Sequence, residues 1–457
     1  MSRQNKLIWQ LRNPSDWSEV LYEVQVHRRS HVGRTICNLT RTHQDWRMRS
    51  QTERLSRLND WYNRLAANQN VWIDRLVRDV GKPVEDAKAE VQYGLDLVKN
   101  INAQWESDST SSRFKVRYHP HGLVGIITPW NNPFSISASK IAAALGFGNS
   151  VVWKPALPAS ALSTALHECL AEVGLDHHVG LITGDGITGD ILVRSPEVKA
   201  LSFTGSIAVG RKIAHSCGRM ARPFQAEMGG NNAAIIMADA DIEAVAQELA
   251  PAMFSFSGQR CTAIRRVIVE EGVFNQFAEA FCEVANNLII GPPGDRATQI
   301  GPVISRQSQR SLVDIIQRAV KEGGELLAGT RLPNNLGDRG CWIAPTVLSN
   351  LHPESPVIRD ELFGPVVALI SAKNLRHAMD IHNNVEQGLL GALFSKCRES
   401  QEYFLNNAQA GMLILNHARP QFDSAAPFIG WKASGFGSPE HGRWDRDFYA
   451  KVQTLYG

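Results

Sequence analysis

Cys261 lies in the segment SGQRCTAIRR, residues 257–266, and its thiol could act as a nucleophile. Nucleophilic catalysis by cysteine needs an activated thiol, hydrogen-bond donors for an oxyanion, and a base for the water that releases the acyl group. The amide of Asn131 and the backbone N–H of Cys261 are candidate donors, and the carboxylate of Glu227 is a candidate base. Each of these residues alone also fits a structural role, since free cysteine packs like a small hydrophobic residue.

The elements that would position these residues alternate between strand-like and helix-like segments. Strand-like patterns occur at LVGIIT, SVVW, VGLIT, VKALSF, NAAIIM and RRVIV, and a helix-like segment follows each of them. Repeated βα units predict an α/β fold with an open, mostly parallel sheet, in which ligands bind beyond the carboxyl ends of the strands. Asn131 follows one of these strands, and we expect Glu227 at the start of another.

The region before this alternation is predicted to be helical. Residues 43–97 repeat apolar side chains at three- and four-residue steps, and GKP at residues 81–83 interrupts the pattern. FKVRYH, residues 114–119, alternates as a strand does. We therefore expect several amphipathic helices and one strand ahead of the βα units.

The composition excludes several classes of protein. A chain of 457 residues predicts two or three domains, and a net charge of +3 gives no reason to expect nucleic acid or an anionic membrane as a partner. The seven cysteines show no CxxC spacing, and His27 and His31 are one isolated HxxxH pair, so no metal is expected. No apolar run reaches the ~18 residues of a membrane helix, and the start does not resemble a signal peptide. We expect a cytoplasmic protein.

Two glycine-containing segments could bind a phosphate. GDGITG, residues 184–189, has G-x-G-x-x-G spacing, but no acidic residue follows at the distance expected for a ribose ligand. An ordinary glycine-rich turn is therefore the preferred interpretation. FTGSIAVG, residues 203–210, follows a strand and opens a helix, where free N–H groups and the helix dipole favour an anion.

Seven segments, in this order, resemble motifs of the aldehyde dehydrogenase superfamily. They are PWNNP, VVWKPA, FTGSIAVG, AEMGGNN, SGQRC, DELFGPV and PFIGWKASGFG. The resemblance runs from about residue 10 to the end of the chain, and the spacing of Glu227 and Cys261 suits the family. One such motif would be weak evidence, whereas seven in register favour an NAD(P)-dependent, non-acylating aldehyde dehydrogenase.

The resemblance implies a role for each matching residue. Cys261 would attack the aldehyde carbon, and Asn131 with the Cys261 N–H would hold the oxyanion of the adduct. Glu227 would activate the water that hydrolyses the thioester. The residues implied to bind NAD or NADP are Thr128, Trp130, Lys154, Ala156, Gly186, Ser206, Val209, Met228, Glu361 and Phe363.

The resemblance also implies three structural parts. A variant Rossmann cofactor-binding domain would comprise residues 1–101 and 121–228, and an α/β catalytic domain residues 229–446. A small β hairpin for oligomerisation would comprise residues 102–120 and 447–457. An exposed edge strand in that hairpin predicts a homodimer or homotetramer.

Leu157 departs from the family pattern in the cofactor site. NAD-preferring members often carry a glutamate there, which binds the adenosine ribose hydroxyls. Without that carboxylate, the free 2′-hydroxyl of NAD has one hydrogen-bond acceptor fewer. The 2′-phosphate of NADP is also no longer repelled by a negative charge at this position. The cofactor is therefore expected to be NAD or NADP.

The substrate is expected to be a small-molecule aldehyde with a polar or anionic tail. Arg260 directly precedes the nucleophile, as in family members that act on phosphorylated or carboxylated aldehydes, and a guanidinium can pair with an anion in bidentate geometry. A surface or ion-paired role for Arg260 fits equally well. The other residues expected to contact the substrate are Thr262, Arg419 and Phe428.

Two alternative functions stay open. A CoA-acylating member would commonly lack the deacylating glutamate, and the presence of Glu227 argues against it. A non-catalytic structural member would be expected to have lost Cys261, Asn131 or Glu227, and all three are present.

Overall fold

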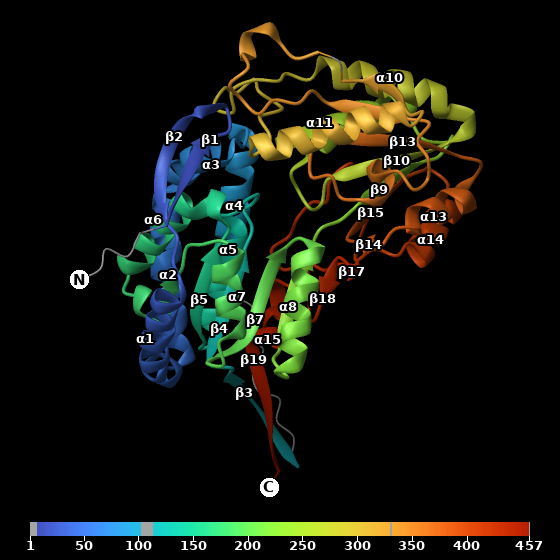
Figure 1. Ribbon diagram of the computed structural model, residues 1–457. Helices are drawn as coiled ribbons and strands as arrows, with labels where there is room; N and C mark the ends of the chain where they lie inside the picture. Colours follow the sequence, from blue (N-terminus) through green and yellow to red (C-terminus); the bar gives the residue numbers. More distant parts are fainter. Residues whose placement is uncertain (1–6, 102–112, 330, 457) are drawn as a thin grey trace.

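The computed structural model describes residues 7–101, 113–329 and 331–456, and its strands form two large open sheets (Figure 1). The first sheet has the strand order β18-β8-β7-β4-β5-β6, and the second has the order β11-β12-β13-β10-β9-β15-β16. Within the first sheet the neighbours from β8 to β6 are parallel, and only β18 is antiparallel. The predicted α/β fold with mostly parallel sheets is confirmed.

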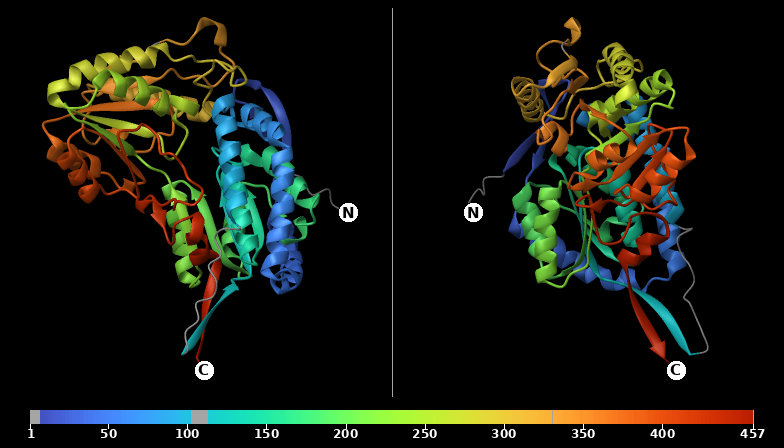
Figure 2. Two further views of the ribbon diagram at one scale, coloured as in Figure 1. Left: turned by 180° about the vertical axis from the view of Figure 1, so that it is seen from behind. Right: turned by 90° about the vertical axis from the view of Figure 1, so that its right-hand side faces the viewer.

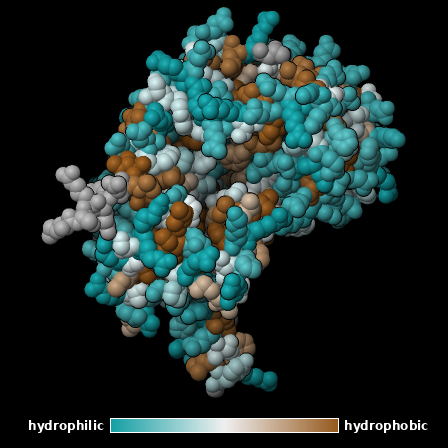
Figure 3. All heavy atoms as spheres, viewed as in Figure 1, coloured by the Kyte–Doolittle hydropathy of each residue, from teal (hydrophilic) through white to brown (hydrophobic). Residues whose placement is uncertain are grey.

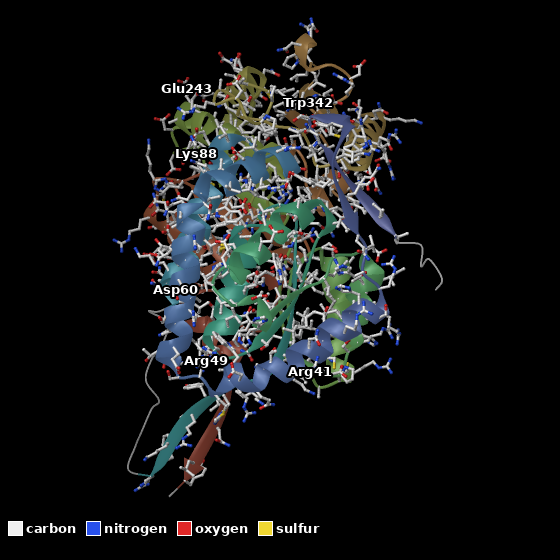
Figure 4. All side chains as sticks on the ribbon, turned by 90° about the vertical axis from the view of Figure 1, so that its left-hand side faces the viewer. Arg41, Arg49, Asp60, Lys88, Glu243 and Trp342 are labelled. Carbon is white, nitrogen blue, oxygen red and sulfur yellow. The ribbon has the colours of Figure 1, made fainter. Side chains whose placement is uncertain are left out.

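The first sheet has helices on both faces. One face packs against α1, α7 and α8, and the other against α2 to α6. The helices are α1 (Arg29–Met48), α2 (Gln51–Ala67), α3 (Gln69–Val80), α4 (Val84–Asn100), α5 (Ser135–Gly146), α6 (Ser160–Ala171), α7 (Gly186–Arg194) and α8 (Ile207–Arg219). The strands are β4 (Leu123–Thr128), β5 (Ser150–Pro155), β6 (Val179–Leu181), β7 (Val198–Gly205), β8 (Phe224–Met228) and β18 (Gly435–Phe436). Figure 4 shows the charged Asp60 and Lys88 on the outer side of these helices.

The second sheet has the same layered construction. Helices α9 and α10 cover one face, and α13 and α14 cover the other. The helices are α9 (Ile242–Phe254), α10 (Phe274–Asn287), α11 (Arg306–Lys321), α12 (Pro356–Arg359), α13 (Leu375–Asn383) and α14 (Arg398–Asn407). The strands are β9 (Asn232–Ile236), β10 (Ile264–Glu270), β11 (Glu325–Ala328), β12 (Thr346–Ser349), β13 (Val366–Ala372), β15 (Leu390–Phe394) and β16 (Met412–Leu415).

The break between α3 and α4 occurs at the predicted GKP segment. Gly81 ends α3 with a φ of 72°, and a Cβ added to it would lie 2.7 Å from the Pro302 side chain. Only glycine combines that left-handed conformation with so close an approach. Pro83 caps the start of α4, so the turn brings α3 and α4 against the segment that follows α10.

In the described part of the chain three antiparallel pairs lie outside the main sheets, and the shortest joins β14 (Gln387–Gly388) to β17 (Trp431–Lys432). β1 (Ile8–Asn13) and β2 (Asp16–Gln25) form an N-terminal hairpin that the sequence pattern did not predict. β3 (Phe114–Pro120) confirms the predicted strand, and it pairs with β19 (Ala450–Tyr456) in a ribbon that projects from the molecule (Figures 1 and 2). Residues 102–112 and 457 of the predicted oligomerisation segment lie outside the described residues.

The surface is mainly hydrophilic on the face shown in Figure 3, with hydrophobic residues in separate patches. The end of the projecting ribbon carries one such patch, and β19 leaves Val452, Leu455 and Tyr456 exposed. None of the helices in the described part of the chain is long and apolar enough to cross a membrane.

Candidate active site

Cys261 follows a short backbone segment of unusual conformation between α9 and β10. Phe256, Ser257 and Gly258 all have left-handed φ angles, of 49°, 53° and 66°. Such a conformation costs free energy at residues other than glycine and persists only where the surroundings fix it. The Ser257 hydroxyl donates to the Gly301 carbonyl at 2.6 Å, and a Cβ on Gly258 would lie 2.4 Å from the Gly364 carbonyl oxygen. The nucleophile loop is thus held by the segments that surround it.

Arg265 holds the same loop from inside the protein. Its guanidinium donates to the carbonyls of Gly258 at 2.9 Å, Arg260 at 2.8 Å and Ala263 at 2.7 Å. The Asn232 amide donates to the Cys261 carbonyl at 2.7 Å. Sequence reasoning missed both residues, although Arg265 stands in the quoted segment. A charged residue at the start of a buried strand was the available signal.

Cys261 lines a cavity of about 440 Å³. Of the residues predicted to take part in chemistry or substrate contact, Cys261, Glu227, Arg260, Thr262, Arg419 and Phe428 line it. Asn131 is buried and does not line the cavity, whereas its neighbour Asn132 does. Within the described residues the Asn131 amide makes no hydrogen bond, so its donors are unengaged.

The surroundings of Cys261 hold its thiol in the protonated form. Burial is the largest cause that raises the pKa of Cys261, to about 12, and the charges of Glu361 and Glu227 act in the same direction. Arg265 and Arg260 oppose them. A reaction at neutral pH therefore requires a group that takes the thiol proton, because the thiolate is the nucleophilic form.

Glu227 is a candidate for the group that takes the thiol proton, because it lines the same cavity as Cys261. It lies next to the end of β8, so the expectation that it begins a strand is wrong; the two glycines that follow it end the strand instead. Burial raises the pKa of Glu227, and the charge of Glu440 raises it further, while Lys140 lowers it. Lys140 pairs with Glu440 and donates to the Ser202 hydroxyl at 2.7 Å. Glu227 is thus a buried carboxyl that can hold and release a proton.

The residues predicted to bind the cofactor include several at one edge of the first sheet. Thr128, Lys154 and Met228 stand at or near the carboxyl ends of β4, β5 and β8, with Ala156 just beyond β5, and Ser206 follows β7. Ser206 is the N-cap of α8 but accepts no capping hydrogen bond, and Val209 in the first turn is exposed. Free N–H groups at this helix start suit a phosphate group.

The N-terminus of α7 differs from that of α8. Asp185 precedes Gly186 and accepts hydrogen bonds from the N–H groups of Ile187 and Thr188. Its carboxylate also pairs with Arg28 at 3.0 Å. The helix start in GDGITG is therefore already occupied by a carboxylate, which agrees with the interpretation of that segment as an ordinary turn.

Lys154 stands beside this turn, and one of its donors has a partner among the residues that the structure describes. Its ammonium donates to the Pro155 carbonyl at 3.1 Å, and its stem lies next to Gly189 of α7. Burial lowers the pKa of Lys154 to about 8, and the charge of Asp185 opposes that effect. Lys154 therefore has hydrogen-bonding capacity left for a ligand at this edge of the sheet.

Glu361 and Phe363 stand in the segment between α12 and β13. The Glu361 carboxylate accepts from the Gly230 N–H at 3.2 Å and stands 3.8 Å from Arg265. Phe363 has a φ of 53° and packs edge-on against Trp130, with ring centroids 5.6 Å apart. The structure thus brings Trp130 and Phe363, two of the predicted cofactor residues, into direct contact.

The cations of the cavity wall already have partners. Arg260 donates to the Ala252 carbonyl, and Arg419 donates to the Pro251 carbonyl at 3.2 Å and stands 3.9 Å from Asp86. Lys82 pairs with Glu90 and donates to Asn132 at 2.7 Å, a cluster that sequence reasoning missed. Among these, only Arg419 has a half-exposed side chain.

Comparison with known proteins identifies the relatives of this chain. The family model described as the aldehyde dehydrogenase family matches residues 2–455. An α-ketoglutaric semialdehyde dehydrogenase from Bacillus subtilis is 30% identical over 98% of this chain and 94% of its own length. A 1-pyrroline-5-carboxylate dehydrogenase from Geobacillus thermodenitrificans is 31% identical over 94% of this chain and 86% of its own. The crystal structure of betaine aldehyde dehydrogenase from Staphylococcus aureus in complex with NAD+ matches with a TM-score of 0.93 and 26% identity, covering 100% of this chain and 92% of that one.

Proposed function

The chain belongs to the aldehyde dehydrogenase family, and we propose that it oxidises an aldehyde to a carboxylic acid with NAD or NADP through a covalent adduct on Cys261. The observation that supports this most directly is the cavity that Cys261 and Glu227 line together. A nucleophile and a buried acid–base group in one cavity are the minimum that acyl chemistry through a thioester requires.

In the first step the Cys261 sulfur bonds to the aldehyde carbon, and the thiol proton passes to a base. The carbonyl oxygen becomes an oxyanion, for which the unengaged Asn131 amide and the Cys261 N–H are the donors we assign. Trp130, Glu361 and Phe363 would hold the nicotinamide cofactor, which would supply the acceptor for the hydride on the same carbon. The adduct is then a thioester on Cys261.

Glu227 is assigned to the hydrolysis of that thioester. Its carboxylate would take a proton from water as the water oxygen bonds to the acyl carbon, and the carbon–sulfur bond then breaks to give the acid and the free thiol. Because burial and Glu440 raise its pKa, Glu227 is a stronger proton acceptor than an exposed glutamate would be.

Hydrogen-bond donors near the carboxyl ends of the strands of the first sheet support the cofactor assignment. The uncapped start of α8 at Ser206 suits the pyrophosphate, and Lys154 has donors left for the adenosine ribose. We assign Thr128, Trp130, Ala156, Gly186, Val209, Met228, Glu361 and Phe363 to the same cofactor site. Residues 1–101 and 121–228 would then form the cofactor domain, and residues 229–446 the catalytic domain.

A polar or anionic aldehyde tail fits the half-exposed Arg419 at the mouth of the cavity. Thr262 and Phe428 belong to the wall that we assign to substrate contact, and Arg260, which also lines the cavity, would contribute its positive charge. We also infer that the β3–β19 ribbon pairs with another subunit in a dimer or tetramer, since each strand of this two-stranded sheet has only one neighbour among the described strands. A cytoplasmic location stays a prediction from the cysteine pattern.

The test is formation of reduced cofactor from NAD and from NADP over a panel of aldehydes. We expect turnover by the wild type, loss of turnover in Cys261→Ala, and a single burst without turnover in Glu227→Gln, because the thioester would form but not hydrolyse. Turnover that appears only when CoA is added would contradict the proposal and favour an acylating enzyme.

A further inference from the structure

His441 has a strained backbone in the wall of the cavity. Its φ of 72° lies in the left-handed region, which carries a conformational cost for a residue with a Cβ. The Asp445 carboxylate accepts from the His441 N–H at 2.9 Å, and the preceding residue, Glu440, exchanges two backbone hydrogen bonds of 2.9 Å with Phe428. These contacts fix the strained conformation. Residues held in this way cluster at functional sites.

The strain has a geometric effect on the cavity. In an extended chain, consecutive side chains point to opposite sides. Glu440 and His441 nevertheless both line the cavity. The left-handed turn at His441 therefore directs its ring to the same space that holds Cys261 and Glu227.

Tyr93 on α4 lies beside this ring. The Tyr93 Oη and His441 Nδ1 atoms are 3.3 Å apart, and both side chains line the cavity. Burial lowers the pKa of His441 to about 4 and raises the pKa of Tyr93, so the imidazole is neutral and the phenol keeps its proton. The pair therefore has two hydrogen-bond donors, one imidazole N–H and one phenol O–H. The hydrogen bond between the two side chains uses one of them.

One donor of the pair is consequently left over. Among the described residues, neither the Tyr93 hydroxyl nor the second ring nitrogen of His441 has another hydrogen-bond partner. Phe422 and Phe428 frame the pair, with centroids 5.5 Å from Tyr93 and 6.0 Å from His441 respectively. In such an apolar frame a satisfied hydrogen bond is strong, and an unsatisfied donor is costly.

We propose that Tyr93 and His441 together are specificity-determining residues that select aldehydes whose tail carries a hydrogen-bond acceptor oxygen. The proposal rests on the proposed function, because it concerns the same cavity. An alkyl tail of equal size would fill the aromatic frame but would leave the donor unpaired. A carbonyl or carboxylate oxygen would accept from it.

The test compares 4-oxopentanal with hexanal, two neutral aldehydes of similar size, of which only the first carries an acceptor oxygen in its tail. For the wild type we expect kcat/KM to be about tenfold higher for 4-oxopentanal, the effect of one ordinary hydrogen bond. In the Tyr93→Phe/His441→Phe double variant the ratio should fall to about one, and the change should lie in KM. A wild-type ratio near one, or a ratio that the double variant retains, would overturn the proposal.

Two further variants guard against an effect of folding. Tyr93→Phe alone keeps the strained residue and leaves one imidazole N–H that no phenol positions, so its ratio should lie between those of the wild type and the double variant. A Tyr93→Phe ratio equal to that of the wild type would overturn the role of the pair, whether or not the double variant folds. Tyr22→Phe is the matched control, because the Tyr22 hydroxyl accepts from Arg75 away from the cavity. It should leave the ratio unchanged.

Binding of product-like acids separates this proposal from the proposed function. We expect 4-oxopentanoate to bind the wild type about tenfold more tightly than hexanoate by isothermal titration calorimetry, and the double variant to bind both equally. If neither aldehyde is turned over but this preference is present, the proposed function fails and the role of Tyr93 and His441 stands. Turnover without any preference between the two tails would overturn that role and leave the proposed function intact.

Discussion

The carboxyl groups of Glu227 and Glu440 line the same cavity, and the charge of Glu440 raises the pKa of Glu227. Burial is the larger cause of that rise, and Lys140 opposes both. Glu440 is also paired with Lys140 and so keeps its position in the wall. The proton affinity of the proposed base is therefore set partly by a residue more than two hundred positions later in the chain.

Glu440→Gln should move the acid limb of the pH–activity profile to lower pH. The change removes a negative charge, so the pKa of Glu227 falls and the carboxylate persists to lower pH. The measurement is kcat between about pH 5 and 9. Glu279→Gln, an exposed residue on α10, is the control and should not move the limb. A limb that moves to higher pH would refute the electrostatic link.

Arg265→Met should lower both stability and activity. Arg265 is buried, donates to three carbonyls of the nucleophile loop and stands 3.8 Å from Glu361. Removing one member of a buried charged cluster costs about 3 kcal/mol, because its partners stay buried without it. Thermal unfolding should show a lower Tm, and the rate of reduced-cofactor formation should fall by about tenfold or more.

Arg310→Met on the exposed side of α11 is the matched change for that experiment. It should alter neither the Tm nor the rate. Retention of full activity in Arg265→Met would show that the loop does not depend on this guanidinium.

Asp79 should make the protein less stable as the pH rises from about 4 to 7. Burial raises the pKa of Asp79 from 3.8 to about 7, so in this window the native chain binds a proton that the unfolded chain has released. Stability is therefore lost progressively up to pH 7, by on the order of 4 kcal/mol in total. Asp79→Asn should remove this dependence and raise the Tm at about pH 8.

The comparison variant for Asp79 is Asp74→Asn. Asp74 lies on the same helix, α3, but its side chain is exposed whereas that of Asp79 is buried. Its change should leave the pH dependence of the Tm intact. If the wild-type Tm does not fall between about pH 4.5 and 7.5, Asp79 does not titrate as its burial requires.

Leu157→Glu should shift cofactor preference toward NAD by about tenfold or more. The new carboxylate would stand next to the end of β5, where it could bind a ribose hydroxyl and repel a 2′-phosphate. Binding of NADH and NADPH by fluorescence gives the preference directly. Leu157→Gln has nearly the same shape without the charge and should shift the preference less; equal shifts would contradict the role of charge.

Local patterns predicted the repeated elements of this fold. The apolar strands such as LVGIIT and the amphipathic helices before them can each be recognised within a few residues, and the structure has β4 and α2 to α4 where expected. The β1–β2 hairpin was missed because its residues are mostly exposed or half-buried and show no clean alternation. Glu227 was misplaced within its strand because a pair of glycines can mark either the beginning or the end of a strand.

The candidate site was predictable only in part, because some of its contacts join residues that are far apart in the sequence. Cys261 and Glu227 stand in recognisable short segments, and the cavity contains both. The pairs Lys140–Glu440 and Tyr93–His441 join residues that stand 300 and 348 positions apart in the chain. No local pattern encodes such a contact, because it exists only after the sheets have brought distant segments together.

The wall of the cavity and the projecting ribbon are parts of one continuous length of chain. Glu440 and His441 lead through α15 (Asp445–Tyr449) directly into β19, whose side chains are exposed. A tag or fusion partner attached after β19 would pull on the same segment that carries these two residues. Immobilisation through the N-terminal side would therefore avoid tension on β19 and on the chain segment that carries Glu440 and His441.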